Sequence, residues 1–217
     1  MESFFFKLSI MLVPGLLAIT CHEVAHGYAA WRLGDPTARM LGRLTLNPFK
    51  HIDPFGTVVL PILLLLIKSP MLFGWAKPVP VDFSNLRKPK TDMIWVSLAG
   101  PMTNLGLALV SAMAYRLITS LGNPAGGYSF VLLPLIYMLL FSVKFNLFLM
   151  LFNLIPVPPL DGGRVLVGLL PDRLSMQFAR LEPYGMIVLF ALLMFGNLTG
   201  NIILPMINLA FRLLITY

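Results

Sequence analysis

The sequence has few of the charged residues that a water-exposed surface requires. Only 12% of its 217 residues are charged, which is about half the share of a soluble globular domain, whereas 58% are hydrophobic. A single cysteine, Cys21, excludes a disulfide framework and any metal site built from cysteines alone. The net charge of +7 comes from basic residues scattered singly between apolar runs, which indicates membrane topology rather than a nucleic-acid partner. We therefore expect an integral membrane protein in a lipid bilayer.

Long apolar runs predict an all-α polytopic fold. A spanning helix needs about 20 apolar residues, and three runs reach that length: Phe4–Cys21 with its continuation to Ala30, Ile94–Ala114, and Phe130–Phe152. The first run lacks a following cleavage site, so we interpret it as a retained span rather than a signal peptide. A polar interruption at residues 196–201 divides Met186–Tyr217, which leaves open one long span or a hairpin of two short helices.

Three shorter segments are not expected to cross the membrane. Turn residues and prolines surround Arg39–Leu46 and Val79–Phe83, which predicts a small membrane-associated β element; the alternative is plain loop structure for both. Phe55–Pro70 contains a continuous apolar run too short to cross the bilayer, so we expect a re-entrant segment. Together these features predict one domain over residues 1–217, with a core at about residues 4–170 and a C-terminal helical segment at about 180–217.

Basic residues predict the orientation of the chain. The loop Thr119–Ser129 carries no charge, whereas the segments after the first and third long runs carry Arg32, Arg39, Arg43, Lys50, Arg164, Arg173 and Arg180. The positive-inside rule places those basic segments in the cytoplasm and the N-terminus outside.

Residues His22–His26 read H-E-x-x-H and use two of only three histidines in the chain. Residues four apart share one face of a helix, so His22 and His26 can bind the same ion. Glu23, beside the first ligand, can accept a proton from an attacking water. Zinc suits two imidazoles with one further protein ligand. Because ionisable residues inside an apolar helix are costly, a chance match is a poor explanation.

A third ligand must come from outside this motif, and the candidates are His51, Asp53, Asp161 and Glu182. A carboxylate is favoured as the third ligand, because the charges of zinc, two neutral imidazoles, one carboxylate and an ionised Glu23 sum to zero. Asp161 ends the segment N-L-I-P-V-P-P-L-D-G-G that begins at Asn153, where prolines must break the third span and glycines permit close backbone approach. The simpler alternative is an aspartate that caps the next helix.

The two motifs together resemble those of the site-2 protease family of intramembrane zinc metalloproteases. The resemblance covers about residues 10 to 170 and includes the Ala99-Gly100-Pro101-Met102-Thr103-Asn104 segment. It implies that His22, His26 and Asp161 bind one zinc ion per chain, that Glu23 is the catalytic base and acid, and that Asn153 contacts substrate. Many relatives carry an inserted PDZ-type domain, and no stretch of this chain is long enough for one.

The implied activity is hydrolysis of peptide bonds in or near transmembrane segments of membrane-protein substrates, as in regulated intramembrane proteolysis. It would take place in the cell membrane, with the active site toward the cytoplasm. Two alternatives use the same histidines: a membrane metal transporter, or a catalytically inactive protein that binds membrane helices. The chain shows no internal repeat of the transporter kind, and metal binding alone does not need Glu23.

Overall fold

The computed structural model describes residues 4–67, 76–121, 129–194 and 198–216, and the regular elements within these ranges are all helical. Four segments are long and apolar enough to cross a membrane: Leu8–Leu33, Pro89–Leu121, Phe130–Asn153 and Thr199–Thr216. They belong to α1 (Phe4–Leu33), α4 (Pro89–Leu121), α5 (Ser129–Asn153), and the pair η4 (Thr199–Ile203) and α9 (Leu204–Thr216). The prediction of an all-helical, multi-pass membrane protein is therefore confirmed.

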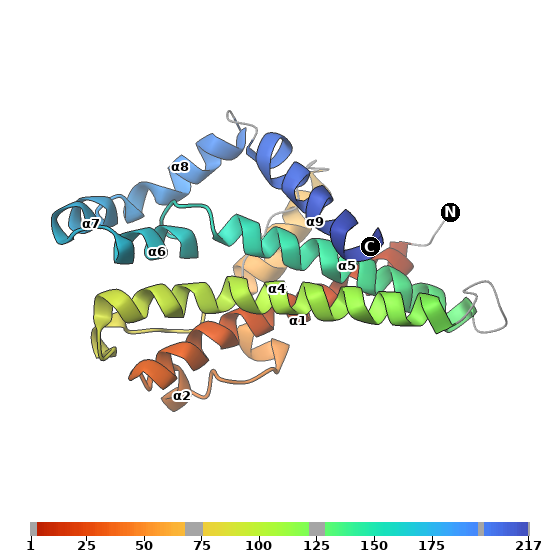
Figure 1. The fold of residues 1–217 in the computed structure, drawn as a ribbon, viewed down its shortest axis with the longest axis horizontal. Helices are drawn as coiled ribbons and strands as arrows, with labels where there is room; N and C mark the ends of the chain where they lie inside the picture. The colour runs from red at the N-terminus through yellow and green to blue at the C-terminus, as the bar shows by residue number, and fades with distance from the viewer. Residues whose placement is uncertain (1–3, 68–75, 122–128, 195–197, 217) are drawn as a thin grey trace.

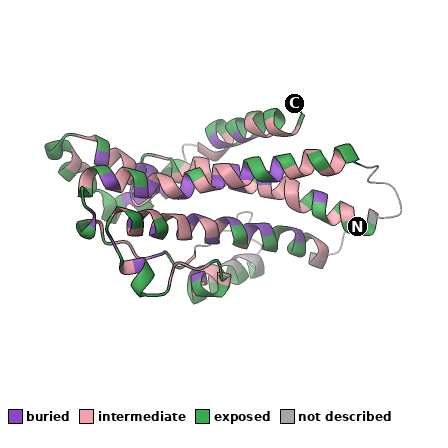
Figure 2. Cartoon of the chain, turned by 60° about the horizontal axis from the view of Figure 1, so that its bottom comes forward, coloured by how far each residue is buried: buried purple, intermediate pink, exposed green. Residues whose placement is uncertain are grey.

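Helices α1, α4 and α5 form the centre of the molecule and pack against one another, with α4 antiparallel to the other two (Figure 1). Their 30, 33 and 25 residues give lengths of about 45, 50 and 38 Å, so each exceeds the roughly 30 Å of bilayer hydrocarbon. Small residues such as Ala18, Ala108 and Ala112 are buried between them, as is typical of closely packed membrane helices. Figure 2 shows the buried residues on the facing sides of the helices.

The first connection, between α1 and α4, holds only short elements in its described residues. They are α2 (Thr37–Met40), the 3₁₀ turns η1 (Pro48–His51) and η3 (Phe83–Asn85), the π-helical turn η2 (Pro54–Val59), and α3 (Leu60–Leu66). Consecutive η2 and α3 together span about 20 Å at 1.5 Å per residue, which is too short to cross the bilayer. The last residues of Phe55–Pro70, from position 68 onward, lie outside the described residues, so re-entry stays a prediction.

The predicted β element is not confirmed, because the described residues contain no strand. The prediction is wrong at the start of Arg39–Leu46, where Arg39 and Met40 belong to α2. The carboxylate of Asp35 accepts a hydrogen bond from the N–H of Thr37 and so favours a helical turn there. Val79–Phe83 forms no ladder either, and prolines at 78 and 80 remove two of the N–H donors that a ladder would need.

The two segments nevertheless lie beside each other. The guanidinium of Arg43 donates hydrogen bonds to the carbonyls of Lys77 and Pro78, at 3.0 and 3.3 Å. The N–H of Lys77 donates to the carbonyl of His51 at 2.9 Å. The side chain of Arg43 thus ties its segment to the residues just before Val79, in place of the predicted strand pairing.

Beyond α5 the chain continues through α6 (Asp161–Leu169), α7 (Asp172–Ala179) and α8 (Glu182–Met194). Helices α7 and α8 meet at a bend of 70°. Figure 1 shows α8 and α9 as separate helices that meet at an angle, so the described part of Met186–Tyr217 forms two helices rather than one continuous span. Helix α9 packs on α4 and α5, and η4 packs on α5. Ile203 of η4 and Ile207 of α9 join a cluster of buried residues with Ala108, Ala112, Val143 and Leu147.

Candidate metal centre

His22 and His26 lie one turn apart on α1 and face the same point between the helices. Their Nε2 atoms are 3.0 Å apart, and the two rings are nearly perpendicular at 85°. Both side chains are largely buried, with 9% and 12% of their surfaces exposed. The helical spacing of the motif therefore produces the shared face that the sequence predicts.

Gly100 allows the backbone of α4 to lie directly against these two rings. A Cβ atom added at Gly100 would lie 2.4 Å from Nε2 of His26 and 2.6 Å from Cε1 of His22. Real Cβ atoms do not approach other atoms so closely, so any larger residue would displace the imidazoles. Because Gly100 has no side chain, the Ala99–Asn104 segment leaves room for the two imidazoles.

Asp161 reaches the histidines because the chain folds back sharply after α5. A Cβ at Gly162 would lie 2.3 Å from the carbonyl oxygen of Leu154, and one at Gly163 would lie 2.4 Å from the nitrogen of Pro158. Only glycine fits where α6 begins against this backbone. The fold-back places Oδ2 of Asp161 at 3.3 Å from Nε2 of His22 and 3.2 Å from Nε2 of His26.

The other three candidates for a third ligand are engaged elsewhere. Nε2 of His51 is 2.9 Å from the carbonyl oxygen of Thr45. The carboxylate of Asp53 accepts hydrogen bonds from the N–H groups of Phe55 and Gly56 at the start of η2. Glu182 lies 3.8 Å from the guanidinium of Arg164. Among the described residues, His22, His26 and Asp161 are the group arranged to hold a metal ion.

Hydrogen bonds on the far side of each ring decide which nitrogen can bind a metal. Nδ1 of His26 is 2.7 Å from the carbonyl oxygen of Val96, which can only accept, so in the neutral ring Nδ1 carries the proton. Nδ1 of His22 lies 2.6 Å from Oδ1 of Asn104, which likewise makes it the donor. Both Nε2 atoms then present lone pairs toward Asp161.

This arrangement leaves three acceptor atoms facing one another with no proton between them. Oδ2 of Asp161 is buried and has no hydrogen-bond partner among the described residues. Such a group is unfavourable unless a cation lies at its centre. Tetrahedral zinc with bonds of 2.0–2.1 Å separates its ligand atoms by roughly 3.3 Å, and the observed separations are 3.0, 3.2 and 3.3 Å. The donor set fits zinc.

Glu23 and Asn153 line the same cleft of about 270 Å³ as the three potential ligands. Oε2 of Glu23 accepts a 2.8 Å hydrogen bond from the N–H of Val79. The amide of Asn153 donates to the carbonyl of Leu149 at 2.9 Å. The cleft also includes Arg164, which sequence reasoning did not single out as a site residue.

The positions of Val79 and Val96 around the site were not predicted, whereas a hydrogen bond between helices was expected of Asn104, and the structure has it. Val79 and Val96 act through backbone atoms, which leave no signal in a side-chain pattern. Asn104 did carry a signal, because it is a polar residue inside an apolar run, but its partner cannot be named without the packing of α4 on α1.

A bundle of apolar helices that buries an H-E-x-x-H motif beside a carboxylate defines a membrane-embedded metallopeptidase. The profile of Peptidase family M50 matches residues 125–196. The chain is 38% identical over 207 residues to "Putative zinc metalloprotease YwhC" of Bacillus subtilis, covering 94% of this chain and 90% of that protein. It is 31% identical over 196 residues to "Putative zinc metalloprotease Rip2" of Mycobacterium tuberculosis, covering 88% and 69%. No solved structure gives a significant match.

The chain therefore belongs to Peptidase family M50, the site-2 protease family. It is a metallopeptidase, a hydrolase whose cofactor is zinc. The resemblance inferred from the paired motifs is confirmed.

Proposed function

We propose that this protein is an intramembrane endopeptidase that cleaves other membrane proteins in or beside their transmembrane segments, with one domain over residues 1–217. His22, His26 and Asp161 hold its zinc ion. The observation that carries the proposal is the buried set of three lone-pair donors, which opens into a cleft within an apolar helical bundle. A site at that position is accessible to peptide bonds near the membrane.

When bound, zinc polarises the scissile carbonyl and makes water a stronger nucleophile. Glu23 is the general base: its carboxylate takes the proton of the attacking water and then delivers that proton to the leaving amine nitrogen. The Val79 N–H holds Oε2 of this carboxylate at the cleft. Asn153 lies at the same cleft and contacts the substrate backbone.

The substrate must enter as extended chain, because a helical segment hides its carbonyls in its own hydrogen bonds. Residues 76–82 have no ladder partner in the described chain, and Pro78, Val79 and Val81 line the cleft. An unwound segment that enters this cleft lies alongside Pro78, Val79 and Val81 while it is cleaved.

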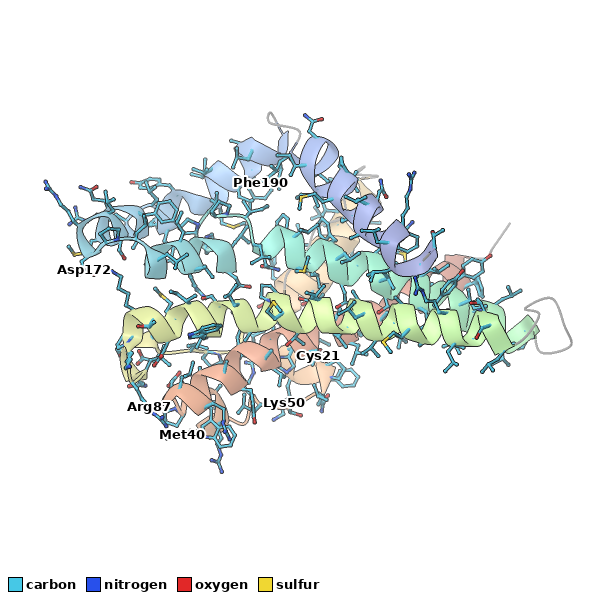
Figure 3. All side chains as sticks on the ribbon, viewed as in Figure 1. Cys21, Met40, Lys50, Arg87, Asp172 and Phe190 are labelled. Carbon is cyan, nitrogen blue, oxygen red and sulfur yellow. The ribbon has the colours of Figure 1, made fainter. Side chains whose placement is uncertain are left out.

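The site faces the cytoplasmic side of the cell membrane. Figure 3 shows Met40, Arg87 and Asp172 at one end of the molecule, and the residues next to them in the chain, Arg39, Lys88 and Arg173, are basic. The positive-inside rule makes this end cytoplasmic. When Phe55–Pro70 returns to the side from which it enters, α1, α4 and α5 cross the membrane in alternating directions. His22, near the end of α1, and Asp161, after α5, then lie at the same depth.

Thiol labelling tests this orientation. Ser84 and Ser120 are both exposed. Ser84 lies shortly before the first residue of α4 and Ser120 lies in its last turn, so they mark opposite ends of this helix. We expect membrane-impermeant reagent added outside the cell to label Ser120→Cys and not Ser84→Cys, each in a Cys21→Ala background. The reverse pattern contradicts the proposed orientation.

The activity is tested with purified protein in detergent and single-span model substrates. We expect cleavage within or next to the span, loss of cleavage with a zinc chelator, and recovery when zinc is restored. Cleavage confined to soluble unfolded peptides contradicts the intramembrane proposal. Zinc flux into sealed vesicles without any cleavage favours the transporter alternative.

A further inference from the structure

A line of buried polar side chains runs from the metal centre into the apolar interface of α4 and α5. Asn104 has no exposed surface and Asn146 is 1% exposed. The amide of Asn104 donates to Oδ1 of Asn146 at 2.8 Å and to the carbonyl of Ala18 at 3.3 Å. The amide of Asn146 in turn donates to the carbonyl of Ser142 at 2.9 Å.

The direction of every hydrogen bond in this line follows from the two backbone carbonyls, because they can only accept. The Ser142 carbonyl requires the NH₂ of Asn146, which turns Oδ1 of Asn146 toward Asn104. That oxygen and the Ala18 carbonyl both require the NH₂ of Asn104, which turns Oδ1 of Asn104 toward His22. Nδ1 of His22 must then be the donor, and Nε2 carries the lone pair.

Helix α4 thus orients both histidines by different means. His26 is fixed by the backbone carbonyl of Val96, which no substitution removes. His22 depends on a side chain, Asn104. If Asn104 and Asn146 served only to join helices, hydrogen bonds to each other and to a backbone carbonyl would be sufficient. The additional contact of Asn104 Oδ1 with Nδ1 of His22, at 2.6 Å, indicates a role at the metal centre.

We propose that Asn104 and Asn146 are positioning residues of the metal centre. Asn104 holds His22 in the Nδ1–H tautomer, and Asn146 fixes the orientation of the Asn104 amide although it touches neither histidine. This inference rests on the proposed zinc site. Hydrogen bonds behind a ligand typically change metal affinity by about 10- to 100-fold.

Four variants separate orientation from packing. Asn104→Leu keeps a similar volume and removes the acceptor for His22, whereas Asn104→Asp retains an acceptor there. Asn146→Leu removes the oxygen that fixes the Asn104 amide. Ser111→Ala is the matched control, because Ser111 is buried at the same helix interface and bonds the hydroxyl of Ser142 at 2.8 Å. That hydroxyl also accepts from the Asn146 amide at 3.2 Å, but the Ser142 carbonyl, which fixes the direction of the Asn146 amide, is unchanged in this variant.

The experiment measures zinc affinity by competition with a chromophoric chelator, and thermal unfolding of the zinc-free proteins. We expect Asn104→Leu to bind zinc about 10- to 100-fold more weakly than the wild type, and Asn146→Leu to be weakened less. Asn104→Asp should recover part of the affinity, because it restores the acceptor for His22 but not the NH₂ group that donates to Asn146 and Ala18. Ser111→Ala should match the wild type.

Wild-type zinc affinity in a folded Asn104→Leu protein overturns the inference and leaves the proposed function standing. If that variant does not fold, equal affinities of Asn146→Leu and Ser111→Ala overturn it. Failure of the wild-type protein itself to bind zinc overturns the proposed function, and this inference with it.

Discussion

The backbone N–H of Val79 donates a 2.8 Å hydrogen bond to Oε2 of Glu23, and this contact joins the connection between α1 and α4 to the metal centre. Gly27, one helical turn beyond Glu23, lets the connection lie so close: a Cβ there would be 2.6 Å from Cγ1 of Val79. The carboxylate is therefore held by a segment far away in the sequence, with its orientation set before substrate arrives.

Replacement of Glu23 by glutamine should separate zinc binding from catalysis. A glutamine retains the size of the side chain and an oxygen for the Val79 N–H, but it has no carboxylate to take a proton. We expect cleavage of a model substrate to fall by about 10²- to 10⁴-fold, with zinc content equal to that of the wild type. Normal cleavage by Glu23→Gln excludes Glu23 as the base.

Gly100→Ala should damage the metal centre from the opposite helix. Its added methyl group would lie 2.4 Å from Nε2 of His26, so the imidazoles must shift, and we expect at least about tenfold weaker zinc binding. The matched control is Gly106→Ala on the same helix, where a Cβ meets nothing within 4 Å. Equal zinc affinity of the two variants contradicts the described packing.

Asp35 should stabilise the connection between α1 and α4 without affecting the chemistry. Its buried carboxylate accepts hydrogen bonds from Thr37, from the N–H of Asp82 at 2.8 Å and from the amide of Asn85 at 3.1 Å. Loss of these bonds in Asp35→Ala should lower the free energy of unfolding by roughly 2–4 kcal/mol. Chemical denaturation in detergent measures the change, and an unchanged midpoint contradicts it.

The same residue gives a pH dependence with a defined sign. Burial by itself would raise the pKa of Asp35, but the hydrogen bonds from Thr37, Asn85 and Asp82 outweigh it and lower this pKa below its ordinary value of 3.8. The stabilisation is therefore complete above the ordinary pKa and is lost as the pH falls through the lower, folded-state pKa. The stability difference between wild type and Asp35→Asn should be constant from about pH 5 upward and shrink only in acid. A difference that shrinks near neutral pH contradicts this account.

Much of the site was predictable because its signals are local. Helical spacing places His22 and His26 on one face. The prolines and glycines around Asp161 predict that the third span ends there and that another part of the backbone approaches closely. The long apolar runs likewise predict the three central helices and a C-terminal helical segment.

The rest depends on contacts between distant segments. Arg39–Leu46 looked like a strand, but the Asp35 carboxylate and Thr37 begin a short helix there. The role of Gly100 follows from which face of α4 meets α1, and the Asn104–Asn146 pair from the packing of three helices. Neither the role of Gly100 nor the Asn104–Asn146 pair can be predicted from the residue pattern of one segment.

The zinc content of purified Asp161→Asn tests the central claim most directly. Asp161 is the proposed third ligand, which only the fold brings to the histidines, so its amide replacement should lose most of the bound zinc while the wild-type protein holds one ion per chain. Asp172→Asn is the matched control, since Asp172 is exposed and pairs with Lys90; it should keep the full ion. Undiminished zinc in Asp161→Asn would contradict the account and move the third ligand to Asp53, His51 or Glu182.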